Sequence, residues 1–107
     1  MPISETETVR INSNDPERWR YEGKRHVCPL FTASYEQTYL EQLEALQEFS
    51  EQSRHGIELL IIEGQLIRQD ESYRAGTWIR IPAGHVADFI AGAQGAKLYV
   101  KTGHLSD

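Results

Sequence analysis

The second half of the chain shows the arrangement of apolar and polar positions that is typical of β-strands. Residues 96–101 alternate between apolar and polar side chains, as half-buried strands do. The other strand-like stretches are apolar and β-branched or alternate more weakly, and they cover residues 57–62, 65–69 and 77–81. Turns separate them, at Asp70-Glu71-Ser72 and at Pro82-Ala83-Gly84. Short strands joined by such turns predict an all-β sandwich or barrel.

The segment from Tyr35 to Gln52 fits two interpretations. It is rich in Glu, Gln and Leu, which favour helices. Large apolar residues also recur at every third position, at Leu40, Leu43, Leu46 and Phe49. This spacing predicts a helix lying across the barrel. The alternative is a strand over Thr38 to Leu43 followed by a loop, and the pattern alone leaves both open.

The apolar stretch at 57–62 has two faces. If Ile57 points into the barrel, the period of two directs Leu59 and Ile61 inwards as well. Leu60 and Ile62 then face outwards. An outward apolar row requires cover from a second sheet or a second subunit, so the pattern predicts a homodimer.

Composition and charge exclude several classes of protein. With 107 residues and 39% hydrophobic positions, the chain predicts a flexible tail over 1–10 and one domain over 11–107 that needs no metal or disulfide to fold. The net charge of −5 argues against nucleic acid or an anionic membrane as a partner. The longest aliphatic run is far too short to span a membrane. The acidic start lacks the features of a signal peptide, which indicates a cytoplasmic protein.

The chain has a single cysteine, Cys28. One cysteine excludes an internal disulfide and every zinc motif built from several cysteines. Cys28 precedes Pro29 in a predicted strand, so we expect a small buried residue there rather than a nucleophile.

Short motifs follow one another in a fixed order along the second half of the chain. Gly76, five residues and then Pro82-Ala83-Gly84 match the second motif of the cupins. The chain resembles this family, and within it the ChrR-like group, which is related to the C-terminal domain of a zinc-binding anti-sigma factor. The resemblance covers residues 19–105 and is carried by Glu58-Leu59-Leu60-Ile61-Ile62-Glu63-Gly64, Tyr73-Arg74-Ala75-Gly76-Thr77-Trp78, Ile81-Pro82-Ala83-Gly84, Val100-Lys101-Thr102-Gly103-His104-Leu105 and, less closely, Val27-Cys28-Pro29-Leu30-Phe31.

The resemblance implies an all-β fold, a small RmlC-like cupin jelly-roll barrel that is often dimeric and has a pocket at one mouth. It also decides between the two interpretations of the Glu-rich segment. Aligned back from Gly64, Thr38 to Leu43 falls on a strand and Ala45 to His55 on the connecting loop. We therefore expect the strand.

The metal ligands of the family are absent from the positions that match them. Cupins usually hold Fe, Mn, Ni or Zn with His-x-His, a Glu and a further His. By resemblance these positions fall on Glu51 and Ser53 (or Ser50 and Gln52), on Ile57 and on Ala87. Because isoleucine and alanine offer no lone pair, we expect a degenerate metal site and no metal cofactor. The corresponding pocket would be lined by Glu51, Ser53, His55, Ile57, Leu59, His85 and Ala87.

Shifted ligands are the alternative. His55, Glu58 and His85, or Glu51, His55 and His85, could bind a divalent Zn, Fe, Mn or Ni, although Glu58 would need a β-bulge to point inwards. Glu51 and Glu58 could also act as a general acid and base.

The sequence therefore favours a stand-alone cupin module that binds a small, partly apolar molecule or mediates assembly. The alternative function is a metal-dependent cupin enzyme of the dioxygenase or isomerase type. Anti-sigma activity is not implied, because the zinc motif of an anti-sigma domain cannot be built from one cysteine.

Overall fold

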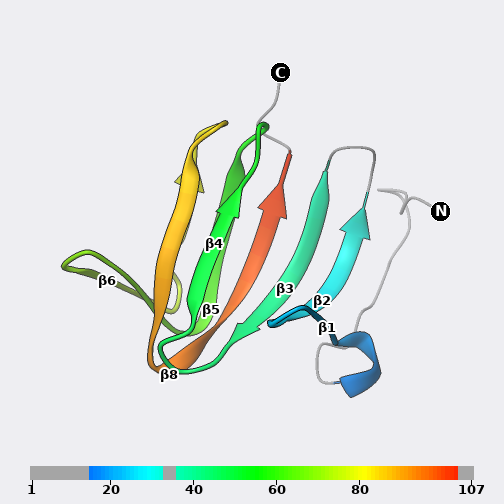
Figure 1. Ribbon diagram of the computed structural model, residues 1–107, viewed down its shortest axis with the longest axis horizontal. Helices are drawn as coiled ribbons and strands as arrows, with labels where there is room; N and C mark the ends of the chain where they lie inside the picture. The colour runs from blue at the N-terminus through cyan, green and yellow to red at the C-terminus, as the bar shows by residue number, and fades with distance from the viewer. Residues whose placement is uncertain (1–14, 33–35, 104–107) are drawn as a thin grey trace.

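Antiparallel β-strands dominate the computed structural model, which describes residues 15–32 and 36–103 (Figure 1). A single 3-10 turn, η1 (Pro16–Arg18), precedes them. The strands are β1 (Arg20–Glu22), β2 (Arg25–Thr32), β3 (Gln37–Leu43), β4 (Glu48–Gln52), β5 (Ile57–Arg68), β6 (Glu71–Arg74), β7 (Trp78–Ile81) and β8 (Val86–Thr102).

Two long, bent strands fold the sheet over on itself. The strands pair in the order β1-β2-β3-β8-β5-β6, while β4 adds to β8 and β7 adds to β5. The first half of β8 pairs with β4 and its second half with β3. In the same way, β5 pairs first with β7 and then with β6. One layer therefore holds β1, β2, β3 and β7 with the first part of β5 and the second part of β8, and the other holds β4 and β6 with the remaining parts of β5 and β8. Because β5 and β8 each belong to both layers, the sheet forms the wall of a small barrel.

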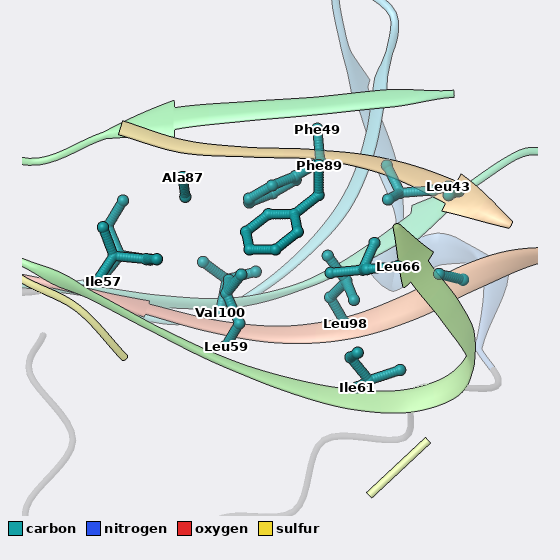
Figure 2. Packing of buried hydrophobic residues seen from close by; sticks show 13 residues of the cluster. Leu43, Phe49, Ile57, Leu59, Ile61, Leu66, Ala87, Phe89, Leu98 and Val100 are labelled. Carbon is teal, nitrogen blue, oxygen red and sulfur yellow. The ribbon is translucent and has the colours of Figure 1, made fainter. Parts of the chain in front are cut away.

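The core lies between these two layers (Figure 2). Phe49 of β4 and Phe89 of β8 are opposite each other in the register and fill the space from one side. Leu59 and Val100 meet them from the other layer. The alternation along β5 is as predicted: Ile57, Leu59 and Ile61 are buried, whereas Leu60 and Ile62 are exposed.

The Glu-rich segment forms strands. The predicted strand over Thr38 to Leu43 is confirmed as β3, which rules out the helix. The predicted loop over Ala45 to His55 is wrong in its middle, where Glu48–Gln52 form β4. The reason is tertiary: β4 pairs along its whole length with β8, and its one large apolar residue, Phe49, is buried against the core.

The other boundaries shift by smaller amounts. The polar turn is centred on Gln69 and Asp70, and Glu71 and Ser72 already belong to β6. Residues 86–95, for which no strand was predicted, form the first part of β8. The tail expected over 1–10, together with His104 and Leu105, lies outside the described residues. Across the described ranges, no helix is long and apolar enough to cross a membrane.

Candidate functional site

Three of the predicted pocket residues lie inside the core. Ile57, Leu59 and Ala87 are completely buried, and their side chains point between the two layers (Figure 2). Two of them, Ile57 and Ala87, stand at positions that match metal ligands in the cupins. Here the same positions contribute apolar side chains to the packed cluster around Phe49 and Phe89.

The polar candidates spread over different faces. His85 is exposed in the turn before β8, and His55 is half-buried, with its backbone N–H donating to Ser53 Oγ at 3.1 Å. Glu58 lies on the outer side of β5, where its cross-strand neighbours are Arg80 and Lys101. The register of β5 is regular from Ile57 to Ile61, so the bulge that would turn Glu58 inwards is not there.

Glu51 is the polar candidate that faces the interior beside the core. It is half-buried, it opposes Ala87 in the β4–β8 register, and its Oε2 lies 2.9 Å from Arg25 Nη1. Within residues 15–32 and 36–103, no group of three or more His, Cys, Asp or Glu side chains could hold a metal. Ile57 and Ala87, at two of the positions matched by the motifs, have no side-chain atom that could bind a metal.

The interior instead contains a charged cluster that the sequence did not predict. Its members come from three strands: Arg25 from β2, Tyr39 and Glu41 from β3, and Glu51 from β4. The period of two places Tyr39 and Glu41 on the same face of β3 as the core residue Leu43. We call these four residues the Arg25 cluster.

The guanidinium of Arg25 lies at the centre of the cluster. Its Nη2 donates to Glu41 Oε1 at 2.6 Å and to the Tyr39 hydroxyl at 2.9 Å. Its Nε is 3.2 Å from both oxygens of Glu41, and its Nη1 is 2.9 Å from Glu51 Oε2. The Tyr39 hydroxyl also donates to Glu51 Oε2 at 3.5 Å. One cation thus connects side chains of both layers.

Burial makes the charges of this cluster unfavourable unless they are paired. The Glu41 side chain is only 1% exposed, and that of Arg25 is 35% exposed. A buried carboxylate is stable as an ion only if a counter-charge or several donors accompany it. The hydrogen bond to Glu41 raises the pKa of Arg25, and burial raises the pKa of Tyr39, with the Glu51 charge adding to that effect. Arg25 therefore stays charged and Tyr39 stays neutral.

A shallow pocket of about 80 Å³ opens beside the cluster. Arg25, Val27 and Tyr39 contribute to its inner wall, and Arg20 and Glu22 of β1, paired at 2.6 Å, contribute to its rim. This volume is well below the several hundred Å³ of a typical site for a drug-sized ligand. The pocket has room only for a small polar molecule or for part of a larger one.

Cys28 is buried, as predicted. Burial also raises the pKa of its thiol. A thiol that is kept protonated and away from solvent is a poor nucleophile.

Comparisons with known proteins identify the fold. No family model matches the chain, and no curated protein matches it. Solved structures do. ChrR of Rhodobacter sphaeroides, in complex with SigE, aligns with a TM-score of 0.68 and 17% identity over 79% of this chain and 49% of that one. An RmlC-like cupin from Shewanella frigidimarina gives 0.68 and 16% over 94% and 92%. An acetylacetone dioxygenase from Acinetobacter johnsonii gives 0.70 and 10% over 94% and 76%.

These likenesses establish the class of fold and no more, since identities of 10–17% do not carry an activity across. The protein has the RmlC-like cupin fold, as its motifs predicted. It spans about half the length of the ChrR chain that it matches.

The contacts of Arg25 predict how much it contributes to the free energy of unfolding. We expect Arg25→Ala to lower the free energy of unfolding by about 3 kcal/mol, because Glu41 would remain buried without its counter-charge. The matched control is Arg20→Ala, which removes an exposed ion pair to Glu22 and should cost under about 1 kcal/mol. Urea unfolding at neutral pH compares the two variants, and equal losses would show that the Arg25 cluster has no special role.

Proposed function

We propose that this protein is a non-enzymatic cupin-fold module that acts through binding and self-assembly as a homodimer, without a resident metal. The apolar residues at two of the matching ligand positions support the metal-free part of this proposal. The support for assembly comes from the outer face of the barrel.

One row of neighbouring side chains crosses that outer face. In register order it runs from β2 through β3, β8 and β5 to β7. The exposed fraction rises along the row, from 0% and 7% at its start to 38% and 61% at its end. Its members are Cys28, Leu40, Tyr99, Leu60 and Trp78.

The two ends of the row differ in what lies near them. At the covered end, the Trp19 ring lies 5.0 Å from the His26 ring and 5.7 Å from Lys97 Nζ. At the other end Leu60 and Trp78 face solvent, next to the exposed Ile62. An exposed apolar strip that continues a covered one is typical of an interaction surface.

A second copy of the chain is the occupant that this surface fits best. The next row along the strands carries Lys101, Glu58 and Arg80 in register. Both signs of charge therefore border the apolar strip. In a two-fold interface the same patch meets itself, and a border of mixed sign avoids the repulsion that a border of one sign would produce.

The proposed dimer predicts which substitutions dissociate it. We expect a dimeric mass in light scattering coupled to size-exclusion chromatography, and a monomeric mass for Leu60→Glu and Trp78→Glu. Val86→Glu and Ile90→Glu are the matched controls, because these residues are 44% and 42% exposed on β8 but lie outside the row. A monomeric wild type, or a dimer that the control substitutions disrupt and Trp78→Glu does not, would contradict the proposal.

The pocket beside Arg25 supports a second candidate function, the binding of a small molecule. Two arginines, a carboxylate and a tyrosine hydroxyl line it together with the apolar Val27. Such a lining fits a small molecule with polar groups at one end and a short apolar part. This function is compatible with assembly, because the pocket and the exposed row lie on opposite faces of the same layer.

Analysis of the purified protein tests both proposals, the absence of a resident metal and the binding of a small molecule. We expect elemental analysis to find Fe, Mn, Ni and Zn well below one atom per chain. Native mass spectrometry should give a dimer in which the mass per chain is that of the bare chain or of the chain with a small organic adduct. A stoichiometric metal that disappears in His55→Ala or His85→Ala would contradict the proposal and support a metal-dependent enzyme. An organic adduct that is lost in Thr32→Trp, at the pocket lining, would support ligand binding there.

A further inference from the structure

Glu51 connects the Arg25 cluster to the position of the missing metal site. In one of the two possible motif registers, Glu51 stands where the first metal-binding His of a cupin would be. It opposes Ala87, which the motif places at the position of the last one. Its carboxylate still faces inwards, but the cation that it contacts is the guanidinium of Arg25, at 2.9 Å.

The surroundings of that guanidinium consist of oxygen atoms. Both oxygens of Glu41, one oxygen of Glu51 and the hydroxyl of Tyr39 lie within 2.6–3.2 Å of its nitrogens. Two carboxylates around one positive charge supply the oxygen ligands that hard divalent cations prefer. Glu41 is almost entirely excluded from solvent, so it needs this charge.

We propose that Arg25 is a built-in cation that takes the electrostatic place of a metal ion inside this barrel. The guanidinium neutralises Glu41 and Glu51, connects the two layers and occupies the space into which a divalent ion would otherwise fit. The protein would then keep the charge balance of its interior whatever metal is supplied. This inference rests on the proposed absence of a resident metal.

The proposal predicts that removing the arginine creates a metal site. In Arg25→Ala, the carboxylates of Glu41 and Glu51 and the hydroxyl of Tyr39 would surround the position that the guanidinium has left. We expect Mn²⁺ to raise the melting temperature of Arg25→Ala and to bind it with a Kd at least about tenfold lower than that of the wild type. The electron paramagnetic resonance signal of free Mn²⁺ gives the Kd and the stoichiometry.

Two further variants identify the ligands. In Arg25→Ala/Glu51→Gln the gain in Mn²⁺ affinity should largely disappear, because one carboxylate is neutral. Arg20→Ala removes an arginine at the rim of the same pocket and should leave Mn²⁺ binding at the wild-type level. If Arg25→Ala fails to fold even with Mn²⁺, the same comparison is made with Arg25→Gln. That variant keeps an amide donor towards Glu41.

The outcomes separate this proposal from the proposed function. Mn²⁺ binding by Arg25→Ala or Arg25→Gln that is no tighter than by the wild type, or that persists when Glu51 is neutral, would overturn the built-in cation. A wild type that holds metal through His55 or His85 would overturn the metal-free function instead, whatever the Arg25 variants do.

Discussion

The buried carboxylate of Glu41 is the constraint on which the interior of this barrel depends. It sits on the inner face of β3, next to the core and almost entirely out of contact with solvent. Such a group is tolerated only with a counter-charge in good geometry, and Arg25 provides it from the neighbouring strand. Arg25 also contacts Glu51 on β4, so the residue that neutralises Glu41 connects the two layers. The apolar core provides most of the driving force for folding, and this ionic contact keeps the buried carboxylate paired.

The contact lies inside a fold that this protein shares with solved cupin structures. The barrel aligns with an acetylacetone dioxygenase and with an RmlC-like cupin over most of their lengths. In this chain, Ile57 and Ala87 contribute apolar atoms to the core, and Arg25 carries a positive charge beside Glu51. The row that ends at Leu60 and Trp78 is exposed at that end, and the pocket beside Arg25 is lined mainly by polar side chains.

Much of the fold could be predicted because its signals are local. The period of two in β5 identified its buried face, and the Gly and Pro spacing of the motifs identified the cupin barrel. The sequence did not predict β4 or the first half of β8. The reason for β4 is that it has a single large apolar residue, Phe49, and is defined by its pairing with β8. Strands of this kind are stabilised by neighbours far along the chain rather than by their own composition.

The candidate site was predictable only at Glu51, which the motif register placed inside the barrel. Arg25 and Glu41 are 16 residues apart and meet only because β2 and β3 pair. Each is an ordinary charged residue in a chain with many, and charged residues on strands normally face solvent. The one available signal was the position of Glu41 between Tyr39 and Leu43, in the inward phase of β3. This signal applies only to a strand, because the period of two does not hold in a helix.

A double-mutant cycle between Arg25 and Glu41 tests the central claim most directly. The cycle replaces the pair by apolar residues of similar size, as Arg25→Met, Glu41→Leu and both together, and measures the free energy of unfolding by urea. If Glu41 is the constraint and Arg25 its counter-charge, Arg25→Met is strongly destabilised and adding Glu41→Leu recovers most of that loss. If the double variant loses the sum of the two single losses, the residues act independently and the account is wrong.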